Sequence, residues 1–334
     1  MTGLARPRPF RVSSFADLDP SLTDAHVAIG NFDGMHRGHQ AVLEKVLAAA
    51  EADGRPALVL TFEPHPRDVF RPDQPVFRLT SPIAKARIAD ALGLDGMVTI
   101  GFDRAFAATP ADAFVRKVVV EGAKARSVAV GWNFHFGAGR SGSPTLLAEA
   151  GLRHSFGVTV VEPFSDEGGT AVSSSRVREA LEAGRIGEAA GLLGYRWFFE
   201  AEVVHGDKRG RTIGYPTANV RLPATARFAH GIYAVMIEID GIARPGVASF
   251  GRRPTFDNGA AVFETHVFDY TGDLYGKTVI VTPVTYLRPE MKFDGIGALV
   301  AQMDQDSAEA RAALSALTPL TPLDRALLFD RIGG

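Results

Sequence analysis

The sequence predicts an N-terminal α/β domain built on a mostly parallel sheet, followed by an antiparallel β-barrel with a C-terminal helix. At 334 residues the chain exceeds the usual size of one hydrophobic core. Short apolar runs alternate with amphipathic stretches up to about residue 185, whereas β-rich segments with no helix between them begin at about residue 195. We therefore expect two domains, residues 1–186 and 187–334.

In the first domain, predicted strands and helices alternate along the chain. Apolar runs indicate the strands, and amphipathic runs between them indicate the helices. Strands separated by such helices pair in parallel and carry helices on both faces of the sheet. The expected strands are 26–30, 56–64, 97–102, 127–132 and 158–164, and the expected helices are 39–54, 81–96, 109–122 and 143–151.

In the second domain, short strands follow one another closely and are broken by Gly, Pro and Asp-Gly turns. This pattern is typical of a closed or nearly closed antiparallel barrel. The expected strands are 196–206, 231–241, 243–251, 260–270 and 277–289, and an amphipathic helix is expected over 295–314. Residues 173–195 are helical in pattern and are expected to join the two domains, and a short tail follows residue 317.

Composition excludes several classes of function. The net charge of −2 gives no general field for nucleic acid or an anionic membrane, so we expect neither as a partner. The absence of cysteine excludes disulfides, thiolate metal sites and a cysteine nucleophile. No apolar run is long enough for a membrane span or typical of a secretory signal, so the expected location is the cytoplasm.

The stretch GNFDGMHRGH, residues 30–39, places two histidines at the expected start of a helix. Free backbone N–H groups and the positive end of the helix dipole favour an anion at this position. His36 and His39 can donate hydrogen bonds to phosphate oxygens, and Gly38 would let a nucleotide approach the backbone. A metal site is a weaker alternative, because neither HExxH nor cysteine is present, and an ordinary solvated pair is another.

Two later loops also follow predicted strands. In SVAVGWNFHFGAGRSG, residues 127–142, Asn133 lies among aromatic residues and glycines, which suits the binding of a flat ring. The alternative is a glycine-rich surface loop with two phenylalanines in the core. In VSSSRVREAL, residues 172–181, serines and arginines at a helix start suit phosphate, although such serines are often only caps.

The stretch VVHGDKRGRTIGYPTANV, residues 203–220, is the most informative part of the second domain. Its glycines and basic residues indicate a flap. Thr217 and Asn219 alternate along an extended segment, so their oxygens lie on one side of it. Such oxygens suit Mg²⁺, which takes few protein ligands, although a basic hairpin loop is an equal alternative.

Taken in order, the motifs resemble one family over nearly the whole chain. GNFDGMHRGH, TFEPHP (61–66), GWNFHFG (131–137) and SSSRVR (173–178) are similar to the nucleotidylyltransferase module of bacterial bifunctional riboflavin kinase/FAD synthetases. PTAN, RPTF (253–256), FETHVFDY (263–270), DLYG (273–276) and YLRPEMKF (286–293) resemble the riboflavin kinase module of the same family. The departures are Ser175 for threonine, Val177 for isoleucine, and Asn133 where many members carry aspartate. HxGH also marks aminoacyl-tRNA synthetases, but their KMSKS element is absent.

The resemblance implies a two-step enzyme with a Rossmann-like nucleotidylyltransferase fold in its first domain. The barrel would phosphorylate riboflavin to FMN, and the first domain would then adenylylate FMN to FAD. His36 and His39 would stabilise the α-phosphate in transfer, and Glu264 would be the general base of the kinase. The other implied residues are Gly30, Phe32, Gly38, Asn133, Ser174, Ser175, Arg176, Gly206, Lys208 and Gly210 for ATP or its phosphates, Phe62, Pro64, His65 and Arg288 for flavin, and Thr217 and Asn219 for the metal.

The same resemblance implies the ligands. ATP is the co-substrate, Mg²⁺ serves both steps, and no tightly bound prosthetic group is required. Riboflavin, FMN, FAD, ADP and pyrophosphate are the other partners, and the chain is expected to be a monomer or a weak homo-oligomer. Two rival functions are a barrel that only senses flavin and an OB-like nucleic-acid-binding barrel. The presence of Glu264, Thr217 and Asn219 disfavours the first, and the net charge of −2 disfavours the second.

Overall fold

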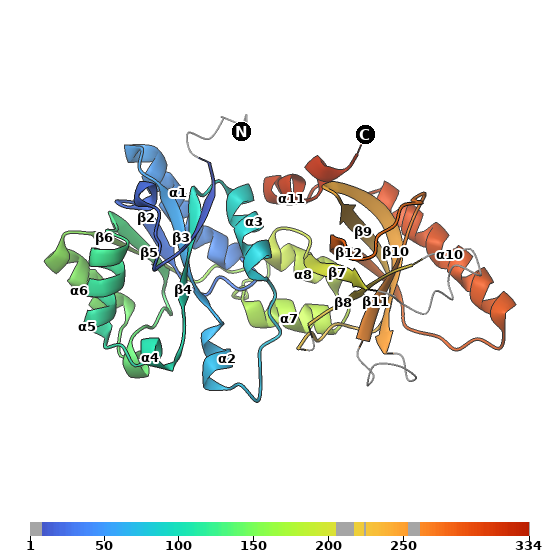
Figure 1. Cartoon of the computed structure of the whole chain (residues 1–334), viewed down its shortest axis with the longest axis horizontal. Coiled ribbons are helices and arrows are strands. Elements are labelled where there is room, and N and C mark those ends of the chain that lie inside the picture. The colour runs from blue at the N-terminus through green and yellow to red at the C-terminus, as the bar shows by residue number, and fades with distance from the viewer. Residues whose placement is uncertain (1–8, 205–216, 224, 253–260, 334) are drawn as a thin grey trace. The chain divides into compact units, whose positions relative to one another are not determined.

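The computed structural model describes residues 9–204, 217–223, 225–252 and 261–333. The chain forms two compact units, Met1–Val76 with Lys85–Ser173, and Phe77–Ala84 with Ser174–Gly334. The first unit contains a parallel sheet and the second a β-barrel (Figure 1). Three residues predicted for the flap, Gly206, Lys208 and Gly210, lie outside the described residues, as does the RPTF stretch.

The first unit contains a six-stranded parallel sheet with the strand order β1-β4-β3-β2-β5-β6. Right-handed crossovers place α1 and α3 on one face and α5 and α6 on the other (Figure 1). The predicted parallel α/β class is therefore confirmed. The strands are β1 (Arg11–Ser14), β2 (His26–Ile29), β3 (Ala57–Glu63), β4 (Gly96–Gly101), β5 (Ser127–Gly131) and β6 (Gly157–Val161). The helices are α1 (Arg37–Asp53), α2 (Pro66–Phe70), α3 (Pro82–Leu92), α4 (Arg104–Ala107), α5 (Ala111–Phe114) and α6 (Pro144–His154).

Two parts of this unit differ from the sequence-based expectation. Strand β1 was not predicted, because its sequence RVSS contains no apolar run, and it gains its place by pairing with β4. The single helix expected over 109–122 is the short α5 followed by a π-helix, Val115–Gly122. Its buried Val115, Val118 and Val119 face the main core of the unit. Their spacing suits either winding, so the sequence did not distinguish the two.

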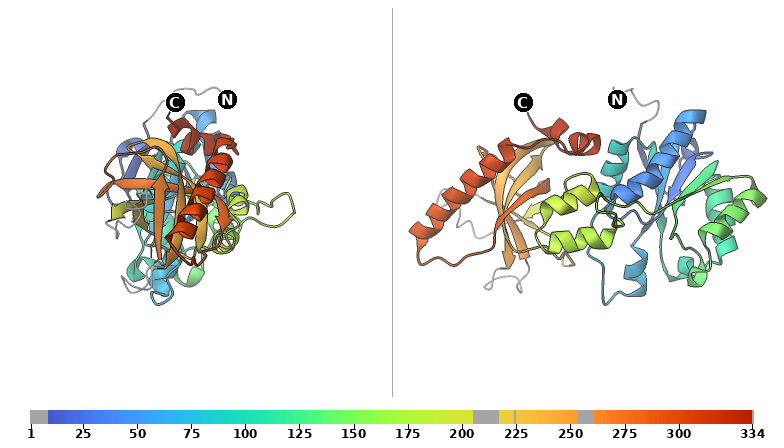
Figure 2. Two further views of the ribbon diagram at one scale, coloured as in Figure 1. Left: turned by 90° about the vertical axis from the view of Figure 1, so that its right-hand side faces the viewer. Right: turned by 180° about the vertical axis from the view of Figure 1, so that it is seen from behind.

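The second unit contains a closed barrel with the strand order β10-β11-β8-β7-β12-β9. Phe263 lies at the centre of its aromatic interior, in ring contact with Phe199, Phe228, Tyr233 and Phe250. Helix α10 packs along the outside of the barrel through Ala310 and Leu314 (Figure 2). The predicted antiparallel barrel with a C-terminal helix is therefore confirmed. The strands are β7 (Phe199–Val204), β8 (Ala218–Arg221), β9 (Gly231–Ile239), β10 (Ile242–Arg252), β11 (Ala261–Val267) and β12 (Thr278–Arg288). The helices are α7 (Ser174–Glu182), α8 (Ile186–Leu193), α10 (Ile296–Ser315) and α11 (Pro322–Leu327).

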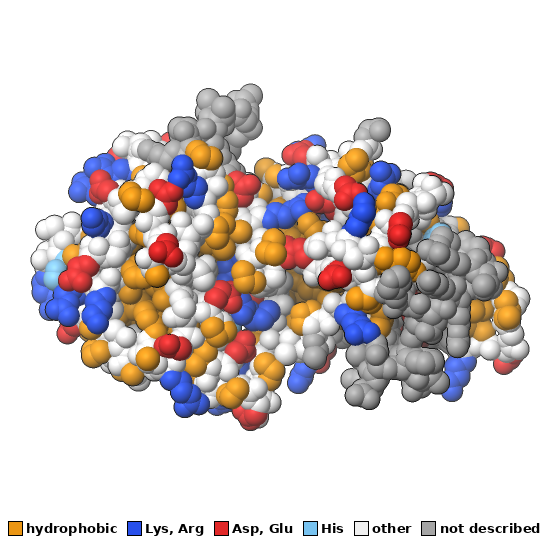
Figure 3. Space-filling view, in the orientation of Figure 1, with side chains coloured by type: hydrophobic (Ala, Val, Ile, Leu, Met, Phe, Trp, Pro, Cys, Tyr) orange, Lys and Arg blue, Asp and Glu red, His pale blue; other side chains and the backbone are white. Residues whose placement is uncertain are grey.

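The surface of the described residues carries both signs of charge. On the face shown in Figure 3, blue basic and red acidic side chains are interspersed among white and orange ones, without a continuous basic band. This mixture agrees with the net charge of −2. None of the helices in the described part of the chain is long and apolar enough to cross a membrane.

Candidate active sites

Three of the predicted loops of the first unit follow neighbouring strands. In the sheet, β2 pairs with β3 on one side and with β5 on the other. The loops that begin after these strands, at residues 30, 64 and 132, therefore leave the same edge of the sheet. The carboxyl edge is where open parallel sheets bind their ligands. The candidate site of this unit is centred on the loop that follows β2.

This central loop has an unusual backbone. Phe32, Gly34 and Met35 have φ values of 48°, 82° and 37°, in the left-handed region. Asp33, Met35 and His36 are buried, so the loop turns inward instead of lying on the surface. Helix α1 then begins at Arg37, where the sequence predicts it. Its first turn is therefore directed at the carboxyl edge of the sheet.

His36 and His39 form a stacked pair at the start of α1. His36 is the N-cap residue, and its Nδ1 accepts a hydrogen bond from the backbone N–H of His39 at 3.3 Å. The ring centroids lie 3.7 Å apart with an angle of 19° between the planes. Because Nδ1 of His36 accepts, the neutral ring carries its proton on Nε2 and can donate a hydrogen bond from there.

His39 is held in the neutral form. Its Nδ1 atom is buried without a hydrogen-bond partner, and its ring contacts Phe32 edge-on at 5.3 Å. Burial lowers the pKa of the His39 imidazole well below its usual value of 6.5, with further lowering by His36 and Lys85. His39 therefore enters the stack as a neutral ring and not as a cation.

Two glycines flank this arrangement closely. A Cβ atom on Gly38 would lie 3.2 Å from the Nδ1 and Cε1 atoms of His36, and one on Gly30 would lie 3.2 Å from the Phe32 ring. Gly38 was predicted to let a nucleotide approach the backbone. The structure gives this glycine an additional role, which is to leave room for the His36 ring.

The segment 164–172 runs along residues 30–39, which we call the histidine turn. Arg37 Nη2 lies 2.8 Å from Glu167 Oε1, and the Arg37 guanidinium lies over the Phe164 ring at 4.8 Å from its centroid. The Val172 carbonyl oxygen lies 3.5 Å from the position of a Cβ on Gly38. Sequence reasoning missed Arg37 and Glu167, since an exposed ion pair between distant residues leaves no motif. The chain therefore passes the turn two residues before α7.

Helix α7 begins at Ser174, as the sequence predicts, with Ser175 and Arg176 in its first turn. These three residues belong to the second unit, whereas His36 and His39 belong to the first. Their joint action on one nucleotide therefore stays a prediction.

The residues predicted to border the flavin lie on and after β3. Phe62 is buried in the core, with ring contacts to Phe102 at 5.9 Å and Phe106 at 6.2 Å. Pro64 is exposed, and His65 caps α2 by accepting a hydrogen bond from the Arg67 N–H at 3.1 Å. Flavin contact by these residues stays a prediction.

The loop after β5 combines an exposed polar residue with buried aromatic ones. Asn133 is exposed immediately after the strand. Phe134 and Phe136 stack at 5.5 Å and pack in the core of the unit, as the alternative interpretation of this loop described, and ring binding at Asn133 stays a prediction. The two phenylalanines therefore anchor the loop, and Asn133 is exposed at the carboxyl edge of the sheet.

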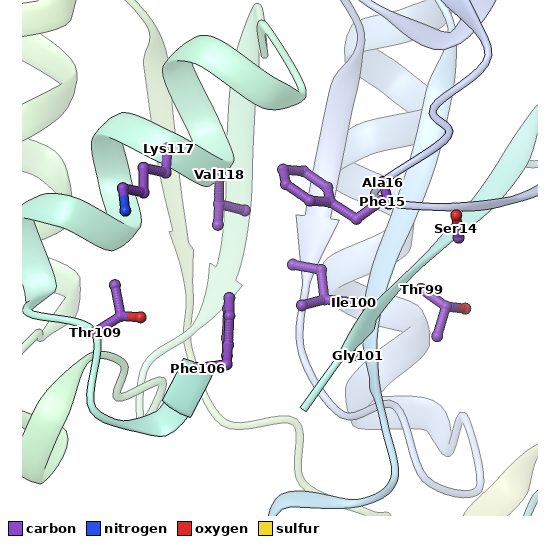
Figure 4. Close-up of a pocket in the computed structure, with 10 residues that line it drawn as sticks. All are labelled: Ser14, Phe15, Ala16, Thr99, Ile100, Gly101, Phe106, Thr109, Lys117 and Val118. Carbon is purple, nitrogen blue, oxygen red and sulfur yellow. The ribbon is translucent and has the colours of Figure 1, made fainter. Parts of the chain in front are cut away.

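A separate cavity of about 380 Å³ lies at the ends of β1 and β4. Figure 4 shows Lys117, Val118 and Thr109 on one side of it, with Phe15 and Ile100 on the other. None of the predicted site residues lines this cavity. This cavity is thus distinct from the chemistry around the histidines, and no sequence motif indicates it.

The candidate site of the second unit lies on one wall of the barrel. Glu264 on β11 is paired in register with Asn219 on β8 and with Ser249 on β10. Its neighbour Phe263 faces the aromatic interior, so the alternation of the strand places Glu264 on the outer face. Asn219 is buried and shares this face. Two residues predicted for the kinase are therefore brought together.

The oxygen atoms at this wall fit a hard divalent cation. Thr217 comes directly before β8 and lines a small cavity with Tyr270 and Tyr275. Its hydroxyl, the Asn219 amide oxygen and the Glu264 carboxylate are all oxygen donors, which Mg²⁺ prefers. Within the described ranges, no group of three His, Asp or Glu side chains could hold a metal ion. A cation here would therefore depend on Thr217 and Asn219, with phosphate and water completing its shell.

Arg288, predicted for the flavin, is held in a bidentate ion pair. Its Nε and Nη2 atoms donate to Asp306 at 2.7 and 2.6 Å, and Asp306 is buried on α10. Gln302 also donates to this carboxylate at 3.0 Å. The pair joins β12 to α10, so Arg288 has a clear structural role whether or not it also contacts a ligand.

Comparison with known proteins decides the family. Residues 18–176 match the family model for FAD synthetase, and residues 193–314 match that for riboflavin kinase. The bifunctional riboflavin kinase/FMN adenylyltransferase of Escherichia coli K12 is 39% identical over 85% of this chain and 91% of its own. The chain belongs to the bifunctional riboflavin kinase/FMN adenylyltransferase family.

Other relatives agree with this assignment. The family members of Pseudomonas fluorescens and Bacillus subtilis are 37% and 34% identical, over 90% and 85% of this chain and 96% and 90% of theirs. A crystal structure from Streptococcus pneumoniae, described as a macrolide-efflux protein, matches with a TM-score of 0.77 and 33% identity. That match covers 88% of this chain and 95% of the other. The enzyme is thus a bifunctional transferase, with FMN adenylyltransferase in the first domain and riboflavin kinase in the second.

Proposed function

We propose that His36 and His39 carry the adenylyl transfer that converts FMN to FAD. A phosphate oxygen of FMN attacks the α-phosphorus of ATP, a P–O bond forms, and the bond to the leaving pyrophosphate breaks. Negative charge increases on the α-phosphate oxygens in the transition state. The Nε2–H of His36 and the N-terminus of α1 both favour that charge. The stacked pair at the centre of the carboxyl edge is the observation that carries this proposal.

The proposed site extends over the surrounding loops. Gly30, Phe32 and Gly38 shape the turn, and Asn133 faces the nucleotide from the neighbouring loop. Ser174, Ser175 and Arg176 would hold the pyrophosphate, as the similarity of SSSRVR to the family motif implies. Phe62, Pro64 and His65 border the flavin or adenine.

We further propose that Glu264 is the general base of the kinase. The riboflavin 5′-hydroxyl attacks the γ-phosphorus of ATP, Glu264 takes the hydroxyl proton, and ADP leaves. The register pairing of Glu264 with Asn219 supports this assignment, because it places a carboxylate beside the proposed metal ligands. Lys208, Gly206 and Gly210 belong to the flap of the same proposal.

The proposal includes Mg²⁺ for both steps. At the barrel, Thr217 and Asn219 would hold it through their side-chain oxygens. When bound, the ion neutralises phosphate charge and orients the γ-phosphate. The cytoplasm as the location, and a monomer or weak homo-oligomer as the assembly, stay predictions that fractionation and light scattering would test.

The experiment is a time course with the full chain. Riboflavin, ATP and Mg²⁺ are incubated with the protein, and the flavins are separated by chromatography. FMN is expected first and FAD second, and EDTA is expected to stop both. Failure to form FMN would contradict the kinase assignment. Accumulation of FMN without FAD would contradict the adenylyltransferase assignment, and full activity in EDTA would contradict the metal.

A further inference from the structure

Lys85 is a buried lysine of the first unit to which the proposed chemistry gives no role. It lies on α3 and is 1% exposed. Its Nζ donates to the Asn31 carbonyl at 3.0 Å and to Thr61 Oγ1 at 2.9 Å, and lies 3.2 Å from Glu63 Oε1. A lysine is almost never fully buried unless it is paired, because desolvating the charge is costly. Its burial therefore calls for a specific reason.

The partners of Lys85 belong to the two loops that form the candidate site. Asn31 is the second residue of the histidine turn, directly before Phe32 with its left-handed backbone. Its carbonyl oxygen accepts a second hydrogen bond from Thr61 Oγ1 at 3.1 Å. Glu63 directly precedes Pro64 of the loop after β3. One ammonium group thus joins the ends of β2 and β3 at the edge where the ligand is proposed to bind.

The histidine turn is held at both of its ends. Lys85 and Thr61 fix it where it leaves β2. Gln40 Nε2 donates to the Met35 carbonyl at 2.8 Å and fixes it where α1 begins. A loop with three left-handed residues needs such support, because each non-glycine residue in that region is strained. The position of the stacked histidines therefore depends on these bonds.

We propose that Lys85 is a positioning residue for adenylyl transfer, which holds the histidine turn through the Asn31 carbonyl and the loop after β3 through Glu63. This inference rests on the proposed function of His36 and His39. The charge of Lys85 has a second effect. Burial is the main cause that disfavours protonation of His39, and His36 and Lys85 add to it. The lysine thus supports the neutral form of His39 as well as the position of its turn.

The test compares the full-length chain with Lys85→Met, in which a neutral side chain of similar length replaces the ammonium group. Lys45→Met on the exposed side of α1 is the matched control. We expect kcat for FMN to FAD to fall about 100-fold, as a misplacement on the order of 1 Å can cause, with a smaller change in KM. Riboflavin kinase activity of the same preparation is expected to stay at the wild-type value. Lys45→Met is expected to show wild-type activity in both assays.

A second readout separates positioning from general loss of structure. The His39 imidazole is titrated by NMR in the wild-type chain and in Lys85→Met. Removing the Lys85 cation is expected to raise the pKa of His39. A wild-type kcat, or an unchanged His39 pKa, in folded Lys85→Met would overturn the inference.

Thr61→Val keeps the charge but removes two hydrogen bonds of Thr61 Oγ1, the one donated to Asn31 and the one accepted from Lys85. This variant is the test if Lys85→Met does not fold. The expected loss in kcat is at least about fivefold, since one hydrogen bond contributes about 1 kcal/mol. Unchanged kcat in Thr61→Val would then overturn the inference. If the wild-type chain itself made no FAD, the proposed function would fail instead, and the two failures are thereby distinguished.

Discussion

The Nδ1 atom of His36 accepts a hydrogen bond from the backbone N–H of His39, while the two imidazole rings stack with their centroids 3.7 Å apart. This relationship makes the two histidines unequal. The tautomer of His36 is fixed by its capping bond, so its Nε2 is a donor of known direction. His39 is kept neutral by its surroundings and has a buried Nδ1 without a partner. Their order in the sequence alone does not reveal this difference.

The first prediction separates capping from catalysis at His36. Asparagine is a good N-cap but does not reach as far as the imidazole Nε2. His36→Asn is therefore expected to retain the thermal stability of the wild-type chain and to lose about 100- to 1,000-fold in kcat for FAD formation, as for a lost oxyanion donor. His36→Ala lacks an N-cap side chain, so its free energy of unfolding should be ~1 kcal/mol below that of the wild-type chain. Wild-type kcat in the asparagine variant would contradict the donor role.

The second prediction concerns Gly38. Because a Cβ there would lie 3.2 Å from His36, Gly38→Ala is expected to displace the ring and lower kcat for FAD formation at least tenfold. Gly187→Ala on α8 is the control, since a Cβ at that position has no atom within 4 Å. Steady-state assays of both reactions would show the difference. Equal activity of the two variants would argue against a crowded His36.

The third prediction is a pH dependence of stability. The pKa of His39 in the folded chain lies below the unfolded value of about 6.5. As the pH falls through 6.5, the unfolded chain gains a proton that the folded chain does not bind. The free energy of unfolding is therefore expected to fall with pH below 6.5, until the lower folded pKa is reached. Urea unfolding at pH 7.5 and 5.5 should show a smaller fall for His39→Gln than for the wild-type chain, and equal falls would refute this account.

The fourth prediction concerns the ion pair between Arg288 and Asp306. Removing one partner of a buried pair leaves an unpaired charge, which costs about 3–5 kcal/mol. Asp306→Ala is expected to reduce the free energy of unfolding by about this amount. The exposed Asp304 on the same helix is the control, and Asp304→Ala should change it by less than about 1 kcal/mol. If urea unfolding showed similar losses for Asp306→Ala and Asp304→Ala, the ion pair would not be what joins β12 to α10.

Much of the fold followed from local pattern. Apolar runs predicted the strands β2 to β6. Strands β2 to β5 are largely buried, as expected for a parallel sheet covered on both faces, whereas β6 is an edge strand whose residues are partly exposed. The glycine-rich turn before Arg37 gave the start of α1. The strand β1 escaped notice because its residues are largely exposed and its place comes from pairing with β4, more than eighty residues later.

The supports of the candidate site could not be predicted in the same way. Lys85 lies in the stretch SPIAKARIADAL, whose pattern predicts a lysine on a solvent-exposed helix face. Its ammonium group can be buried because it donates hydrogen bonds to Asn31 and Thr61, which are distant in sequence. The partner of Arg288 likewise lies on another element. Motifs identify residues that touch ligands, whereas the residues that hold them are specified by tertiary packing.

The most direct test of the account assigns each step to its own site. Glu264→Gln and His39→Ala are each incubated with riboflavin, and separately with FMN, in the presence of ATP and Mg²⁺. Glu264→Gln is expected to form no FMN from riboflavin but to convert added FMN to FAD. His39→Ala is expected to form FMN from riboflavin but no FAD from either flavin. Loss of both activities in either variant, or retention of both, would contradict two separate sites built around these residues.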